Sequence, residues 1–280
     1  MRKIWKKIIL VSMLLIAAVS LSACESYGNE LQNKNAVYKK VNASKTIIWG
    51  VRNDTRLFGL MDIKENKLVG FDIDLAKAIT KQMFGKDGKA VLFQTSSKTK
   101  IPVLKNGNVD ALMATVTVTP ERAKVVDFST PYFNAGQSLL VPKNSKIKNV
   151  KDLNKPGIVV VAVKGTTAVA NIRKFAPKAR VLEYDDYGQA FTALKAGQGQ
   201  AMSTDNGILA GIASENKGFH VVGGTFTHEP YAVAVNKGED KLAKQIDKAL
   251  KELEENGTYD RLMHKWFDGI PGFSIKEAER

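Results

Sequence analysis

The sequence predicts an α/β protein that contains two units in tandem. Apolar runs of strand length alternate with amphipathic runs of helix length, and this alternation starts again near the middle of the chain. Strands that alternate with helices are typical of a mainly parallel sheet that is covered on both faces. With 280 residues, of which 44% are hydrophobic, the chain can bury cores of this kind.

The first series begins with a strand at 46–51, TIIWGV, and continues with an amphipathic helix at 71–85. Asp72 and Asp74 lie in the first turn of that helix, where the positive end of the helix dipole favours carboxylates. Three further elements complete the series: a strand at 89–95, a short helix at 98–107 and a strand at 109–118.

The second series follows the same order. It contains a strand at 157–165, a helix at 167–177, a strand at 180–184, a helix at 186–197 and a strand at 200–205. No internal repeat is strong enough to make the two units copies of each other.

The first 24 residues indicate export. Four bases precede an apolar run that is too short to span a membrane, and small residues follow it before Cys24. We therefore expect a signal peptide at 1–23. The ending LSAC resembles the bacterial lipobox, which predicts a lipid anchor at Cys24; the alternative is an ordinary cleavage site followed by a free cysteine. Because Cys24 is the only cysteine, no internal disulfide is possible.

The exported chain is basic and starts with a polar segment. Without the four bases at 1–23, the 42 basic residues fall to 38, against 28 acidic ones. This excess favours the anionic outer face of a membrane, and the export signal disfavours nucleic acid as a partner. Residues 24–44 lack clear periodicity, so we expect a flexible tether there.

Hydroxyls and a guanidinium gather at the end of the predicted strand at 109–118, in MATVTVTPER. These side chains are Thr115, Thr117, Thr119 and Arg122. Strand alternation would point the threonines to one face, at the sheet edge where α/β proteins bind ligands. The planar fork of Arg122 suits a carboxylate. The alternative is a surface ion pair of Arg122 with Glu121 or Asp127.

The second unit offers matching groups. Gly165 predicts a turn, and Thr166 and Thr167 stand where a helix begins, so free N–H groups there can attract an anion. One of these threonines can equally serve as the helix cap. Asp205 ends a strand and can pair with an ammonium group, although a plain capping role is the alternative.

Five segments in the same order resemble the polar amino-acid substrate-binding proteins of ABC importers, and specifically their glutamine- and glutamate-binding lipoproteins. They are GFDIDLAKAI (70–79), LKNGNVDALMATVTVTPERAKVVDFSTPYF (104–133), VKGTTA (163–168), TALKAGQGQAMSTDN (192–206) and LEENGTYDRLMHKWF (253–267). The resemblance covers nearly all of the exported chain.

This resemblance implies the type II periplasmic-binding-protein fold, in which two crossing hinge strands join two α/β lobes and the ligand binds between them. Lobe 1 would comprise 45–133 plus 231–280, and lobe 2 would comprise 137–228. The ligand would close the lobes by a hinge rotation. The closed form, a lipid-anchored monomer on the outer face of the cell membrane, would then dock on ABC permease subunits served by a separate ATPase.

The resemblance also implies roles for individual residues. Arg122 and Thr117 would hold the α-carboxylate of an amino acid, with the backbone near Thr115 assisting, while Asp205 would pair with the α-ammonium. Lys100 matches a position that is often arginine in glutamate- and aspartate-binding relatives. Lysine lacks the bidentate fork, which puts strict selectivity for acidic ligands in doubt.

Other residues near the predicted cleft are compatible with more than one amino-acid ligand. Arg52 could pair with an acidic side chain, Asp54 could offset that charge or accept from a carboxamide, and Tyr231 could line the cleft or act as an ordinary hinge aromatic. Glutamine and glutamate both fit, and aspartate remains an alternative.

Two other functional classes remain, a lipid-anchored amino-acid sensor and a dehydratase-like enzyme of the same fold. The enzyme is disfavoured because no nucleophile elbow is present and the three histidines lack metal-ligand spacing. We therefore expect no cofactor and no metal ion.

Overall fold

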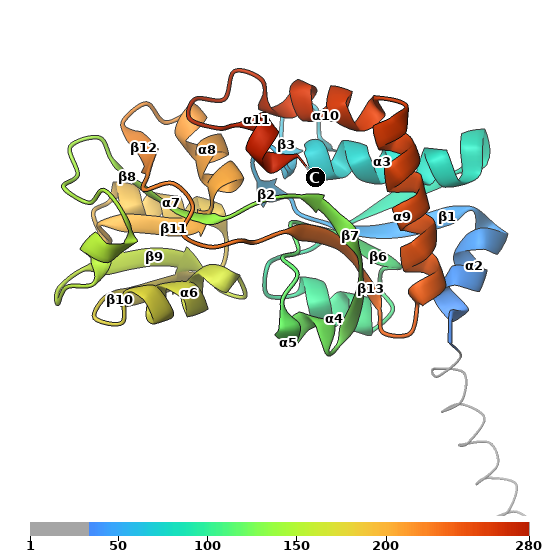
Figure 1. Ribbon diagram of the computed structural model, residues 1–280, viewed down its shortest axis with the longest axis horizontal. Coiled ribbons are helices and arrows are strands. Elements are labelled where there is room, and N and C mark those ends of the chain that lie inside the picture. The colour runs from blue at the N-terminus through green and yellow to red at the C-terminus, as the bar shows by residue number, and fades with distance from the viewer. Residues whose placement is uncertain (1–33, 280) are drawn as a thin grey trace, which may run out of the picture. The chain divides into compact units, whose positions relative to one another are not determined.

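The computed structural model describes residues 34–279, so the expected signal peptide and Cys24 lie outside the described residues. Val37–Arg280 form one compact unit. This unit contains two five-stranded sheets, each flanked by helices, and a small three-stranded sheet (Figure 1). The first five-stranded sheet with its helices is called lobe 1 below, and the second with its helices is called lobe 2. The expected α/β class is thus present.

The strands of lobe 1 follow the order β5-β1-β6-β13-β7. Their bounds are β5 Lys89–Gln94, β1 Thr46–Val51, β6 Ala111–Met113, β13 Tyr231–Asn236 and β7 Val126–Phe133. β1 pairs in parallel with β5 and β6, whereas β13 runs antiparallel to β6 and β7. The small sheet consists of β2 Asp54–Thr55, β3 Gly59–Asp62 and β4 Lys67–Val69.

Lobe 2 repeats this pattern in the order β10-β9-β11-β8-β12. Its strands are β10 Arg180–Tyr184, β9 Val159–Val163, β11 Ala201–Asp205, β8 Gln137–Pro142 and β12 Phe219–Val222. β9 pairs in parallel with β10 and β11, and β8 pairs antiparallel with β11 and β12. The expectation of mainly parallel sheets therefore holds for only half of the strand pairs in the two five-stranded sheets. The reason is that strands beside the hinge carry the chain out of one lobe and back, so they run in opposite directions.

The helices are distributed by lobe. Those of lobe 1 are α2 Ala36–Ser44, α3 Phe71–Phe84, α4 Lys100–Lys105, α5 Pro120–Ala123, α9 Asp240–Glu255, α10 Thr258–Phe267 and α11 Ile275–Ala278, with a 3₁₀ turn η1 at Gly85–Asp87. Those of lobe 2 are α6 Thr167–Phe175, α7 Tyr187–Lys195 and α8 Asn206–Ser214, with η2 at Val150–Leu153.

The long helix α9 shows why these segments become helices. Its buried residues recur every three or four positions: Leu242, Ala243, Ile246, Ala249, Leu250 and Leu253. This spacing places them on one face, which packs against α3 and β7. Burial of each leucine stabilises the lobe by about 1.5–3 kcal/mol.

Two segments cross between the lobes, one from β7 to β8 and the other from β12 to β13. They are bonded to each other, because the backbone N–H of Glu229 donates to the carbonyl of Ala135 at 2.7 Å. A Cβ on Gly136 would lie 2.5 Å from the carbonyl oxygen of Thr227, so only glycine permits this close approach.

The expected tether is wrong for its last part, because Ala36–Ser44 form the helix α2. Val41 is fully buried, and the backbone N–H groups of Val37 and Tyr38 donate to the carboxylate of Glu239 at 2.9 and 3.0 Å. A distant side chain thus supplies the cap that the local sequence lacks. Sequence periodicity alone could not reveal that partner.

Candidate functional site

A cavity lies between the lobes, beyond the carboxyl ends of parallel strands from both sheets. Lobe 1 lines it with Ser97, Lys100, Thr115, Thr117 and Arg122, and lobe 2 lines it with Thr166, Thr167, Tyr187 and Asp205. The carboxyl ends of strands in open α/β sheets are the usual place for a ligand. Seven of the nine lining residues are among the site residues predicted from the sequence.

Arg122 is placed by the short helix α5. Thr119 caps this helix by accepting from the backbone N–H of Arg122 at 3.2 Å. The guanidinium donates to the carbonyl of Thr117 at 2.8 Å and to the carbonyl of Gly165, in lobe 2, at 3.3 Å. Burial lowers the pKa of Arg122, yet the group stays charged because arginine is effectively always protonated. Two of its five N–H donors are used, so three remain for an anion.

The alternative of a surface ion pair does not hold for Arg122. Asp127, one of its two expected partners, instead accepts from Lys237 at 2.7 Å, and no bond from Arg122 to Glu121 is present within the described residues.

The three threonines do not lie on a strand, which corrects the argument from strand alternation. β6 ends at Met113, and Thr115 has a left-handed backbone with φ 45°. Thr117 forms only an isolated bridge with Tyr231, and Thr119 caps α5. The chain turns out of the sheet at Thr115, so Thr115 and Thr117 reach the cavity through this turn.

In lobe 2, the loop before α6 closes against lobe 1. Gly165 has φ 78°, and a Cβ there would lie 2.7 Å from the carbonyl oxygen of Ser97. Thr166 occupies the N-cap position but donates its hydroxyl to the carbonyl of Val163 at 2.7 Å rather than capping. The first N–H groups of α6 are therefore not capped by a side chain of Thr166, and they carry the positive end of the helix dipole.

Asp205 ends β11 at the N-cap position of α8, but its side chain does not cap that helix. Its carboxylate accepts from the hydroxyl of Tyr231 and, at 3.4 Å, from the amide of Gln137. Asp205 is 5% exposed. Burial and, less strongly, the negative charge of Glu229 raise its pKa to about 7, against the lowering effects of the Tyr231 bond, Lys100 and Arg122.

Lys100 is 3% exposed and donates to two backbone carbonyls, those of Ala114 at 2.9 Å and Thr115 at 3.0 Å. No ion pair with a carboxylate involves its ammonium among the described residues. Burial, together with the positive charges of Arg122 and Arg52, holds its pKa well below the ordinary value.

Arg52 and Asp54 do not line this cavity but lie behind it. The fully buried guanidinium of Arg52 donates to Asp54 at 2.7 and 2.9 Å and to the hydroxyl of Ser97. Its carbon Cζ also lies 5.5 Å from the ring centre of Tyr187. Asp54 therefore offsets the positive charge of Arg52, which is one of the two roles expected for it.

Tyr231 is fully buried and lies behind Asp205, not in the cavity wall. Its ring stacks on Phe133 with centres 5.6 Å apart and meets the edge of Phe58 at 5.7 Å. The side chain of Tyr231 thus contacts the site through Asp205, because its ring packs in the core while its hydroxyl bonds to Asp205.

Sequence reasoning missed Tyr187, Ser97 and Gln137. The hydroxyl of Tyr187 lies 3.1 Å from that of Thr204, and its backbone N–H donates to Asp54 at 3.3 Å. The amide of Gln137 donates to the hydroxyl of Thr167 at 2.9 Å. No local pattern marks these residues, since each is brought to the site by contacts across the fold.

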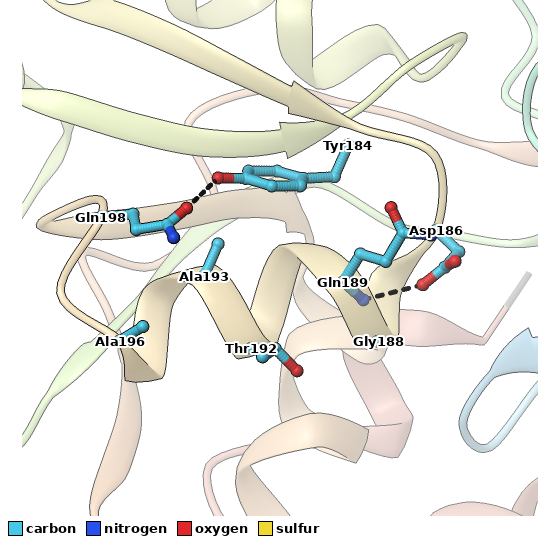
Figure 2. A pocket seen from close by; sticks show the side chains of 8 residues that line it. All are labelled: Tyr184, Asp186, Gly188, Gln189, Thr192, Ala193, Ala196 and Gln198. Carbon is cyan, nitrogen blue, oxygen red and sulfur yellow. Dashed lines mark hydrogen bonds between the residues drawn. The ribbon is translucent and has the colours of Figure 1, made fainter.

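A second hollow lies on lobe 2, between the end of β10, α7 and the chain that follows α7 (Figure 2). Two pairs of its lining residues are hydrogen-bonded: the hydroxyl of Tyr184 donates to Gln198 at 2.6 Å, and Asp186 accepts from the backbone N–H of Gln189 at 2.8 Å. No cation lines it. This hollow therefore lacks the opposed charges that distinguish the cavity between the lobes.

Within residues 34–279, no cluster of three His, Cys, Asp or Glu side chains could bind a metal ion. No helix in the same range is both long and apolar enough to cross a membrane.

The fold and the cavity define a protein that binds a small zwitterion between two lobes. Residues 47–269 match the family of bacterial extracellular solute-binding proteins, family 3, and the chain belongs to this family. The family binds amino acids between two lobes, and its members serve ABC importers outside the cytoplasm.

Two relatives narrow the comparison. The chain is 48% identical over 271 residues to the ABC transporter glutamine-binding protein GlnH of Bacillus subtilis (strain 168), with 95% of this chain and 99% of that protein covered. It is 43% identical over 255 residues to a glutamine-binding protein of Geobacillus stearothermophilus, with 87% and 96% covered.

A solved structure is similar as well. It is an ancestral arginine-binding protein bound to glutamine, which is 40% identical and matches with a TM-score of 0.74 over 80% of this chain and 98% of its own. The resemblance inferred from the five sequence segments is thus confirmed at the level of the family.

Proposed function

We propose that this protein captures glutamine for an ABC importer and performs no chemistry on it. The main support is the arrangement of opposite charges across one cavity: Arg122 stands on the lobe 1 side and Asp205 on the lobe 2 side. An α-carboxylate can take the free donors of Arg122, while the α-ammonium pairs with Asp205. Thr117 and the N-terminus of α6 would complete the carboxylate end.

The choice of glutamine rests on the charges at the other end of the cavity. Arg52 has its fork committed to Asp54, so this pair brings no net charge to the ligand. Among the described residues, Lys100 is then the one cation of the cavity wall besides Arg122. Its ammonium can donate to a carboxamide oxygen, and an acidic side chain would lack the bidentate partner that selects carboxylates. The names of the two relatives support the same ligand.

The working cycle follows from the position of the cavity. An amino acid that contacts both lobes binds their closed arrangement better than an open one, and it therefore shifts the population toward closure. Hinge closure is the motion by which periplasmic binding proteins respond to ligand. The closed form would dock, as a monomer, on the permease.

We further propose that Cys24 carries a lipid that keeps the exported protein on the outer face of the membrane. Two acyl chains give stable attachment where a single chain does not. Cys24→Ser should move the protein from the membrane fraction to the soluble fraction and leave glutamine affinity unchanged. Membrane retention of this variant would refute the anchor.

The function is tested by calorimetric titration of the ligand-free protein with the common amino acids. Glutamine should bind tightly, and glutamate and aspartate should bind more weakly. Preference for glutamate or aspartate would support an acidic amino-acid receptor instead. Absence of binding to every amino acid tested would refute capture of an amino acid.

A further inference from the structure

Asp72 and Asp74 share the first turn of α3 but have different surroundings. The side chain of Asp74 is 21% exposed and accepts from two residues of α10, Lys265 at 2.6 Å and the indole of Trp266 at 2.9 Å. Asp72 is 0% exposed. A carboxylate that served only the helix dipole would not need to be buried, because that interaction works at the surface.

The carboxylate of Asp72 contacts the turn that lines the cavity. It accepts from the backbone N–H of Thr115 at 2.9 Å and from the hydroxyl of Tyr132 at 3.0 Å. Tyr132 is itself held in place, since its carbonyl accepts from the hydroxyl of Tyr259 at 2.7 Å. Asp72 does not line the cavity, so its links to a ligand there are its hydrogen bond to Thr115 and its charge near Lys100.

The backbone of Thr115 needs such support. Its φ of 45° is left-handed, a conformation that is strained for a β-branched residue. The turn aims two successive carbonyls, those of Ala114 and Thr115, at the ammonium of Lys100. The position of Lys100 in the cavity wall therefore depends on this conformation.

We propose that Asp72 is a positioning residue of the binding cavity: by bonding the N–H of Thr115, it holds the left-handed turn that places Lys100 and the Thr115 side chain against the ligand. This inference rests on the proposed function, because it takes the cavity between the lobes to be the amino-acid site.

The charge state of Asp72 agrees with this role. Burial raises its pKa to about 6, against the lowering effect of the bonds from Thr115 and Tyr132 and of the cations Lys100 and Arg52. At pH 8 the group is therefore a carboxylate, and both of its oxygens accept.

The test compares Asp72→Asn with Asp74→Asn, which removes a charge from the same helical turn away from the cavity. Calorimetric titration with glutamine at pH 8 should show roughly tenfold or greater loss of affinity for Asp72→Asn, because a buried charged acceptor is lost. Asp74→Asn should change the affinity by less than about twofold. Equal effects of the two substitutions would overturn the proposal.

A double-mutant cycle with Thr115→Gly separates positioning from general damage. Glycine adopts positive φ without strain, so the turn no longer needs Asp72 to hold it. In the Thr115→Gly protein, Asp72→Asn should therefore cost much less affinity than it costs in the natural protein. The same loss in both backgrounds would refute an action through Thr115.

Two controls keep the outcome interpretable. If Asp72→Asn does not fold, Tyr132→Phe replaces it. This variant removes one donor to Asp72 and should also weaken glutamine binding. Unchanged affinity would count against the proposal.

The natural protein is titrated first. Its failure to bind any amino acid would refute the proposed function, whereas normal binding by Asp72→Asn would refute this inference alone.

Discussion

The two ends of the cavity use their charged groups differently. At the carboxylate end, Arg122 donates two of its N–H groups to backbone carbonyls, and three remain available for a ligand. At the side-chain end, Arg52 is bonded to Asp54 and Ser97, and Lys100 is bonded to the carbonyls of Ala114 and Thr115. A positive residue in a sequence thus indicates ligand binding only when contacts within the protein leave some of its N–H donors unused.

The same difference sets the order of the expected effects. Loss of a cation that has free donors should harm binding of every amino acid, because all of them carry an α-carboxylate. Loss of a cation that is bonded inside the protein should instead change the preference among side chains. The predictions below test this contrast, from the largest effect to the smallest.

Arg122→Ala should weaken glutamine binding by about 2–5 kcal/mol, since it leaves a desolvated carboxylate without its charged partner. Calorimetric titration measures the loss. Arg122→Lys is the matched variant, because it keeps the charge but lacks the planar fork. Its glutamine affinity should lie between those of the natural protein and Arg122→Ala. Natural affinity in Arg122→Ala would show that the ligand carboxylate is held elsewhere.

Glutamine affinity should depend on the ionisation of Asp205. Burial raises the pKa of Asp205 to about 7, so its protonated form grows as pH falls through 7 and can no longer pair with an ammonium. Affinity should therefore drop below pH 7, by up to about tenfold per pH unit, in titrations between pH 5 and 8. Asp205→Asn should bind glutamine weakly, and its affinity should no longer drop below pH 7. An equal drop in that variant would show that another group causes the pH dependence.

Ionisation of Asp205 has the opposite effect on folding stability: it favours ligand binding but destabilises the folded protein. Because its pKa is raised in the folded protein, it contributes stability that is fully present below pH 3.8 and is lost as pH rises through 7. The ionised Asp205 of the ligand-free protein is therefore a cost that a bound ammonium would relieve.

Lys100→Met should lower glutamine affinity by roughly tenfold or less, because one hydrogen bond to a charged donor is lost, and it should shift the ratio of glutamine to glutamate affinity. Competition between the two ligands measures that ratio. Lys105→Met, at the exposed end of the same helix α4, removes the same charge and should leave the ratio unchanged. A ratio that Lys100→Met does not alter would remove Lys100 from side-chain recognition.

Elements whose signal is local could be predicted well. The strand at 46–51 matches β1 in full, and the helix expected at 71–85 is α3, Phe71–Phe84. Elements that depend on distant partners could not. The strand expected at 109–118 is cut to Ala111–Met113, since Asp72 holds the chain in a turn at Thr115.

The site divides in the same way. The residue types at Arg122, Thr117 and Asp205 could be selected from the sequence, because their chemistry is a local property, but only Asp205 lies at a strand end as expected. The pairing of Arg52 with Asp54, two residues away, is also a local property and was among the expectations. The sequence could not show that Tyr231 bonds to Asp205, because this contact joins two strands of different lobes.

The sequence by itself determined the α/β class, the order of most elements and the opposite charges that an amino acid requires. Only the tertiary structure decided which of those charges face the cavity and which are satisfied inside the protein. The physical reason is that periodicity and helix or turn signals act over a few residues, whereas burial and hydrogen-bond pairing depend on contacts between β1, β6, α3 and the hinge that exist only after the chain has folded.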